Sequence, residues 1–192
     1  MILFIQFLLL LFLVAILAYE ILLGIELIRL SRGDVPYVPS TDEVIHAVMN
    51  ANVLPKDGMI LDLGCGDGKA LRLFAAAGYQ GPLVGYERAP FPWLLGVIRS
   101  IRVRSRVRLH LQDTKHAPLG DAKGVYLFLM DKPLAELAPL LEAHLPPGIP
   151  VVSAEFPVPG WTPEQVLTAK GVTERQAKIY VYRTGVLRSS AL

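Results

Sequence analysis

The sequence predicts an α/β protein with a mostly parallel sheet, preceded by one apolar helix that is long enough to cross a membrane. Three observations carry this prediction. Gln6 is the only polar side chain between residues 2 and 18. Short apolar runs then alternate with helical patterns, which is typical of parallel sheets. The last two strand-like segments have no helix between them, so one edge strand should be antiparallel.

The apolar segment at the N-terminus has the length of a membrane-spanning helix. About 18 residues at ~1.5 Å rise per residue nearly match a hydrocarbon core of about 30 Å. Basic residues follow this segment and none precedes it, so it lacks the positive region of a cleaved signal peptide. We expect residues 1–30 to form a single-pass transmembrane anchor with the following domain on the cytoplasmic side. A buried core helix is the alternative, but the segment lacks amphipathic spacing.

The overall composition excludes few functions. The net charge of +2 implies no strong field for nucleic acid, so no nucleic-acid partner is expected. Cys65 is the single cysteine, which excludes an internal disulfide and fits a reducing compartment. His110 and His116 lack metal-ligand spacing, and we expect no metal.

Residues 31–52 are predicted to form a linker followed by a helix, and residues 53–188 to form one α/β domain. Ser40 and Glu43 match a capping box at the start of that helix. An apolar stripe at helical spacing follows, formed by Val44, Ile45, Val48 and Met49.

The domain itself contains seven strand-like segments. Helical patterns are expected within 67–78, 89–105 and 133–145. Residues 124–130 are apolar on both faces, as a central parallel strand should be. The strands are expected at 59–64, 82–87, 107–113, 124–130, 149–156, 164–169 and 177–183.

A glycine-rich turn, "LGCGDG", follows the first strand of the domain. Gly64, Gly66 and Gly68 allow positive φ and a close approach of the backbone to a ligand. Ligands of open α/β sheets bind at the carboxyl ends of the strands, where this turn lies. A dinucleotide fingerprint would need glycine at Lys69, and a P-loop would need Ser or Thr at Ala70. The turn therefore indicates another cofactor.

Three acidic residues at strand ends indicate which cofactor. Asp62 suits the ammonium of an amino-acid moiety, and Glu87 is placed to accept both hydroxyls of a ribose. Asp113 could meet an adenine amino group. Together with the glycines they describe S-adenosylmethionine. Each acid could instead cap a helix or face solvent, an alternative that is plausible for Asp113 alone.

The pattern is that of the class I, seven-β-strand methyltransferases, whose sheet is Rossmann-like. Three further segments resemble the membrane-anchored protein-lysine methyltransferases that modify adenine nucleotide translocase and the ATP synthase c subunit. They are "VPYVPS" (35–40), "GYERAP" (85–90) and "FPVPGWTP" (156–163). That family commonly has Ser where Cys65 stands and Asn where Ala89 stands. The resemblance and the turn together imply a cofactor site formed by Tyr37, Asp62, Gly64, Cys65, Gly66, Gly68, Glu87, Arg88 and Asp113.

The resemblance also implies that the acceptor is a lysine, whose amine must lose its proton before the nitrogen has a lone pair for the methyl group. A narrow apolar slot disfavours the charged amine. Candidates for the slot are Phe128, Met130, Phe156 and Trp161. Asp131 could orient the amine, so Asp131 and Trp161 are the candidate catalytic residues. The aromatic side chains could instead be ordinary core, and Asp131 could cap the helix near Pro133.

Other functions remain open at this stage. The chain could methylate a lipid or quinone, or it could bind the cofactor without transferring a methyl group. A basic stretch contains Arg99, Arg102, Arg104, Arg106 and Arg108. It could be a solvated face, a contact to anionic headgroups or a contact to RNA, although the small net charge and the lack of interleaved aromatic residues argue against RNA. The expected methyl acceptor is a membrane-associated protein.

Overall fold

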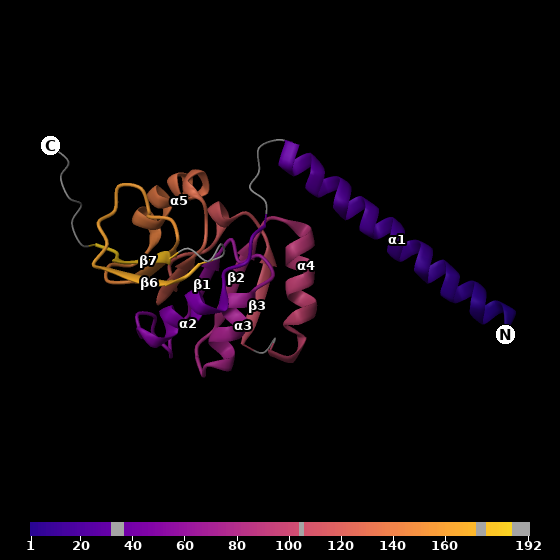
Figure 1. Cartoon of the computed structure of the whole chain (residues 1–192), viewed down its shortest axis with the longest axis horizontal. Helices are drawn as coiled ribbons and strands as arrows, with labels where there is room; N and C mark the ends of the chain where they lie inside the picture. The colour runs from indigo at the N-terminus through magenta and orange to yellow at the C-terminus, as the bar shows by residue number, and fades with distance from the viewer. Residues whose placement is uncertain (32–36, 104–105, 172–175, 186–192) are drawn as a thin grey trace.

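The computed structural model describes residues 1–31, 37–103, 106–171 and 176–185. Helix α1 (Ile2–Ser31) extends away from the α/β domain as one long rod (Figure 1). Its segment Ile2–Ile25 is long and apolar enough to cross a membrane, and the most apolar part of that segment is not buried in the protein. Val35 and Pro36 of the expected "VPYVPS" segment lie outside the described residues.

Seven strands form one sheet in the order β3-β2-β1-β4-β5-β7-β6, which confirms the predicted fold class. β7 is antiparallel to β5 and β6, and the ladders among β1 to β5 are parallel. The β1 residue Asp62 lies opposite Gly85 of β2 and Tyr126 of β4. The strands are β1 (Ile60–Leu63), β2 (Leu83–Glu87), β3 (Val107–Leu111), β4 (Gly124–Leu127), β5 (Pro150–Ala154), β6 (Gln165–Lys170) and β7 (Gln176–Arg183).

Helices cover both faces of the sheet. α2 (Asp42–Asn50) and α3 (Lys69–Ala76) bury their apolar stripes on one face, and α5 (Asp131–His144) covers the other. α4 (Pro90–Arg99) packs on the edge strand β3 and its neighbour β2. Two short 3₁₀ helices, η1 (Ile101–Val103) and η2 (Thr114–His116), flank β3.

The start of α2 differs from the expected capping box. Thr41 is the N-cap, and its hydroxyl accepts a hydrogen bond from the Val44 amide at 3.3 Å. Ser40 is buried instead, and its hydroxyl lies 2.9 Å from that of Tyr126. A buried hydroxyl needs a partner, so Ser40 joins the domain core and the cap moves one residue along.

The end of β4 also differs from the expectation. β4 ends at Leu127, and α5 begins at Asp131 with Met130 as its N-cap. Asp131 is therefore in the first turn of α5 and is not its cap. An acidic residue in that position stabilises the partial positive charge of the helix N-terminus.

Candidate active site

The glycine turn folds tightly at the carboxyl end of β1. Gly64, Gly66 and Gly68 have φ values of 85°, 53° and 70°, a region that L side chains rarely adopt. The amides of Gly64 and Cys65 both donate to the carbonyl of Tyr86, at 2.8 and 3.1 Å. The turn is thus tied to β2, and backbone lies where a ligand could approach closely.

The Glu87 carboxylate is buried at the end of β2 and holds two backbone amides. Its Oε2 accepts from Gly66 at 2.9 Å, and its Oε1 accepts from Ala89 at 2.7 Å. A carboxylate can accept about four hydrogen bonds. These two bonds fix the orientation of the carboxylate. Its oxygens are acceptors, which suits them to the hydroxyls of a ligand.

Asp62 is a second buried carboxylate beside the turn. Burial, followed by the negative charges of Glu87 and Asp67, raises the pKa of Asp62 well above its usual 3.8. Two adjacent buried acids disfavour each other's ionised form, and a cation between them relieves that repulsion. The site therefore favours a positively charged ligand.

Asp67 was missed by the sequence analysis and organises the turn. Its buried carboxylate pairs with Arg99 of α4 and with Arg72 of α3, the latter at 3.2 Å. Burial opposes ionisation, but the two guanidinium groups outweigh it and lower the pKa of Asp67. Burial and the Asp67 charge in turn raise the pKa of Tyr37. This acid has no local signal in the sequence, because Arg99 lies 32 residues away and the contact with Arg72 depends on how α3 follows the turn.

Tyr37 lies directly over the turn. Its ring occupies the place that a Cβ at Gly66 would take. Lys69 connects the two segments as well, because its Nζ donates to the Ser40 carbonyl at 2.9 Å and pairs with Asp42 at 2.6 Å. The residues before α2 therefore cover the predicted cofactor site.

The other residues of the predicted cofactor site vary in burial. Cys65 is buried against Gly85, and burial raises the pKa of its thiol, which makes it a filler of space and a poor nucleophile. Asp113 is half-buried after β3, and its Oδ1 accepts from the Lys115 amide at 2.9 Å. Arg88 is exposed, and its charge acts on Lys115.

The candidate acceptor residues follow β4 and β5. Leu129 lies against Gly64, which brings the segment after β4 to the glycine turn. Phe128, Phe156 and Trp161 are half-buried, whereas Met130 and Asp131 are exposed. Among the described residues, the buried Nε1 of Trp161 has no hydrogen-bond partner.

Glu155 is a further acidic residue that the sequence analysis left without a role. It directly follows β5 with φ 66°, an unusual value for a residue with a side chain. Its amide donates to the Lys178 carbonyl at 2.7 Å. Its charge contributes to the raised pKa of Tyr126, for which burial is the main cause. Strained backbone of this kind gathers at functional sites.

Two arginines of the basic stretch have structural partners. Arg99 pairs with Asp67, and Arg106 donates to the Tyr79 carbonyl at 3.1 Å. Arg102 and Arg108 are exposed, and Arg104 lies outside the described residues. The stretch is thus only partly a solvated face.

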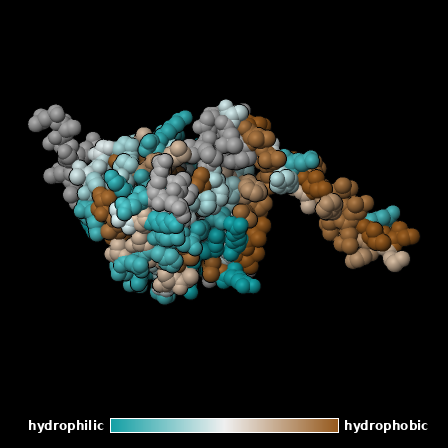
Figure 2. Space-filling model, viewed as in Figure 1, coloured by the Kyte–Doolittle hydropathy of each residue, from teal (hydrophilic) through white to brown (hydrophobic). Residues whose placement is uncertain are grey.

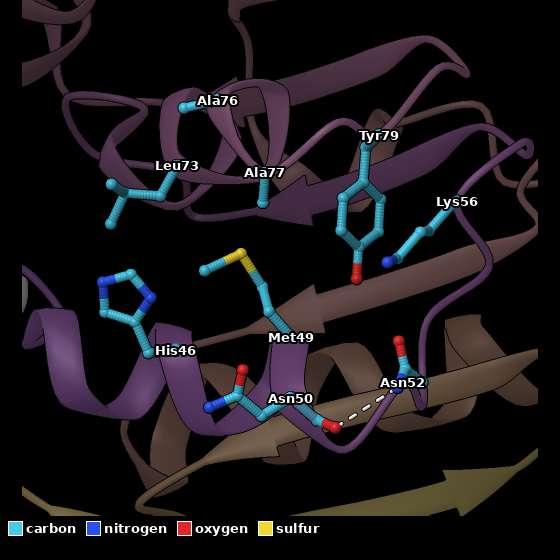
Figure 3. A pocket seen from close by; sticks show the side chains of 9 residues that line it. All are labelled: His46, Met49, Asn50, Asn52, Lys56, Leu73, Ala76, Ala77 and Tyr79. Carbon is cyan, nitrogen blue, oxygen red and sulfur yellow. Dashed lines mark hydrogen bonds between the residues drawn. The ribbon is translucent and has the colours of Figure 1, made fainter.

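A hollow of about 520 Å³ lies elsewhere, between α2 and α3 (Figure 3). Ala76, at its wall, is the last residue of α3, whereas the glycine turn precedes the first. The hollow contains none of the predicted site residues. It is lined by His46, Met49, Asn50, Asn52, Lys56, Leu73, Ala76, Ala77 and Tyr79.

Comparison with known proteins places the chain among methyltransferases. The family model of the ANTKMT methyltransferase domain matches residues 62–165. The adenine nucleotide translocase lysine N-methyltransferase of Mus musculus is 34% identical over 140 residues, which cover 71% of this chain and 59% of the mouse protein. A protein-lysine N-methyltransferase of Saccharolobus islandicus is 30% identical over 155 residues, covering 79% of this chain and 94% of the archaeal protein.

A solved structure confirms the fold. The RNA methyltransferase from Salinibacter ruber in complex with S-adenosyl-L-homocysteine superposes with a TM-score of 0.70 at 24% identity. The match covers 79% of this chain and 97% of that structure. At this identity the similarity concerns the fold alone.

Proposed function

Because the chain belongs to the family of ANTKMT methyltransferase domains, we propose that it is an S-adenosylmethionine-dependent protein-lysine N-methyltransferase. Its substrate would be a membrane-associated protein. The archaeal relative has nearly the extent of the matched region and is named for protein lysine, which supports this acceptor. The chain spans 59% of the mouse relative, so that protein's own target is not carried over.

The paired carboxylates are the observation that carries the proposal. Buried Asp62 and Glu87 flank a turn of three positive-φ glycines, and the charge of Glu87 helps to raise the pKa of Asp62. S-adenosylmethionine fits these two carboxylates, because its ammonium and sulfonium are positive and its ribose presents two hydroxyls. When bound, it supplies a methyl group that is already activated for transfer.

The protein would then contribute orientation. Asp62 would hold the ammonium, Glu87 the ribose hydroxyls, and Asp113 the adenine amino group. The backbone of Gly64, Cys65, Gly66 and Gly68 would line the path of the cofactor. Tyr37 would cover it, and Arg88 would lie at its exposed side.

The acceptor lysine must arrive uncharged, because an ammonium has no lone pair. Half-buried Phe128, Phe156 and Trp161, with Met130 at the rim, would form an apolar slot that lowers the pKa of the amine. Asp131 would orient the amine at the mouth of that slot. Alignment of the amine with the methyl group is the main source of rate, since the cofactor is already reactive.

The proposed location is a membrane, with α1 as a single-pass anchor and the domain on the cytoplasmic side. The support is the apolar length of Ile2–Ile25, whose most apolar part is not buried in the protein. An anchored enzyme meets membrane-protein substrates at high local concentration.

The test is transfer of label from radioactive S-adenosylmethionine to membranes of the host by the full-length protein. Gly64→Arg should abolish transfer, because the new Cβ in the glycine turn would lie 2.5 Å from the side chain of Leu129. Gly78→Arg is the matched control, since Gly78 also has positive φ but open space around it.

Labelled methyl-lysine in a protein band, lost only in Gly64→Arg, is the expected result. Label only in the organic extract would replace the proposal with a lipid or quinone substrate. Cofactor binding without any transfer, to membranes or to soluble extract, would indicate a non-catalytic binding protein.

A further inference from the structure

The outward side of α4 is apolar, and we propose that it rests in the interface of an anionic bilayer, the one that α1 spans. This inference rests on the proposed anchoring by α1. It adds a second membrane contact, made by the catalytic domain itself.

The burial pattern of α4 is the first argument. Pro92 and Gly96 are the buried residues of this helix, four positions apart, so the domain covers only a narrow line along it. Phe91 and Ile98 lie outside this buried line and are 43% and 57% exposed. Ile101 of η1, which is 58% exposed, continues the same exposed apolar side. A helix that is apolar on all sides is normally covered on all sides. Protein covers one side here, and the other sides need an apolar medium.

The position of α4 beside α1 indicates that this apolar medium is the membrane. α4 contacts α1, so the chain would leave the bilayer beside this helix. Figure 2 shows a hydrophobic surface over α4 on the side of the domain next to α1. If α1 crosses the membrane, its contact with α4 keeps the apolar side of α4 close to the membrane surface.

Charge supports an anionic surface. Residues 90–103 contain two arginines, Arg99 and Arg102, and no acidic residue. Both arginines are exposed and lie next to Ile98 and Ile101 in the sequence, although Arg99 also forms an ion pair with Asp67. Apolar side chains with basic residues at their margin are the pattern of helices that lie in the interface of anionic membranes.

The test uses the full-length protein in vesicles of phosphatidylcholine and phosphatidylglycerol. A single environment-sensitive fluorophore is attached at Ile98→Cys, or at the control position Val166→Cys on edge strand β6. Val166 is 46% exposed, and β6 lies at the opposite edge of the sheet from β3, on which α4 packs. Cys65 is buried and should stay unlabelled. Phe12→Cys reports whether α1 has entered the bilayer.

Spin-labelled lipids should quench the fluorophore at position 98 several-fold more than at position 166, and aqueous iodide should do the opposite. If the protein floats with the vesicles and position 98 is as water-exposed as position 166, the inference is wrong and the anchor stands. An apolar protein partner would then be the occupant of this side of α4. If Phe12→Cys is not quenched by lipid, both the anchor and the inference are wrong.

Discussion

The Glu87 carboxylate accepts a hydrogen bond of 2.9 Å from the backbone amide of Gly66, a residue in the glycine turn of the neighbouring strand. One side chain thereby joins the carboxyl ends of β1 and β2. The same group is the proposed acceptor for ribose hydroxyls, so the shape of the turn and the binding of the cofactor depend on one carboxylate.

Glu87→Gln should weaken binding of S-adenosylmethionine roughly 10- to 100-fold. The amide keeps one acceptor oxygen, but its NH₂ would meet the N–H of Gly66 or Ala89, and charge-assisted hydrogen bonds contribute about 1.5–3 kcal/mol. Titration calorimetry measures the dissociation constant. Glu136→Gln is the control, because Glu136 is exposed and pairs with Lys115. An unchanged dissociation constant in Glu87→Gln would contradict the assigned role.

Cofactor binding should release a proton and tighten as the pH rises. The pKa of Asp62 lies above 3.8 in the free protein, and a positively charged ligand lowers it. The same shift means that the free protein loses stability as the pH rises through the folded pKa. Calorimetry in buffers of different ionisation enthalpy counts the released protons. Asp62→Asn should abolish this dependence, and proton uptake by the wild type would refute it.

Asp67→Asn should destabilise the protein by about 2 kcal/mol, because it breaks a buried ion pair and leaves Arg72 without its charge partner. The value is discounted because Arg99 is half-exposed. Since the pKa of Asp67 is lowered by folding, its contribution is present above 3.8 and is lost as the pH falls below that value. Thermal unfolding in detergent is the measurement. The exposed pair of Glu164 and Arg183 supplies the control, and Glu164→Gln should change stability by under ~0.5 kcal/mol.

Gly66→Ala should impair cofactor binding through two separable effects. The new Cβ would displace the Tyr37 ring, and φ 53° strains any L residue by about 1–2 kcal/mol. The same contact affects stability. The double variant Gly66→Ala with Tyr37→Ala should lose less unfolding free energy than the sum of the losses in the two single variants, measured by thermal unfolding. Gly78→Ala measures strain alone, since no atom lies within 4 Å of its Cβ. Strict additivity of the two changes would show that Tyr37 does not contact the turn in solution.

Trp161→Phe should lower kcat/KM for the protein substrate about tenfold and leave stability nearly unchanged. The indole N–H is buried without a partner among the described residues, so its removal costs little. Trp93→Phe gives the opposite pattern, because the Trp93 indole donates to the Leu109 carbonyl at 3.1 Å and its loss costs about 1 kcal/mol. Steady-state kinetics and thermal unfolding together separate the two. An equal kcat/KM in Trp161→Phe and Trp93→Phe would show that Trp161 does not line the slot.

The residues proposed to hold the cofactor could be inferred from the sequence because their signals are local. Gly64, Gly66 and Gly68 stand within one turn, and Asp62 and Glu87 each end an apolar run. The residues proposed to hold the acceptor have no such local signal. Phe128, Phe156 and Trp161 come from different loops, and apolar side chains look the same in a slot and in a core.

The amino-acid sequence was enough to predict the succession of strands and helices along the chain, the family, the glycine turn and the apolar N-terminal helix. Each depends on periodicity, on backbone freedom or on charge within a few residues. Contacts between residues that are distant in the sequence became visible only in the folded protein. It paired Asp67 with Arg99 across 32 residues and Ser40 with Tyr126 across 86. It also left one side of α4 uncovered. The partners of buried polar groups depend on packing between distant segments, and local sequence patterns do not reveal which segments pack together.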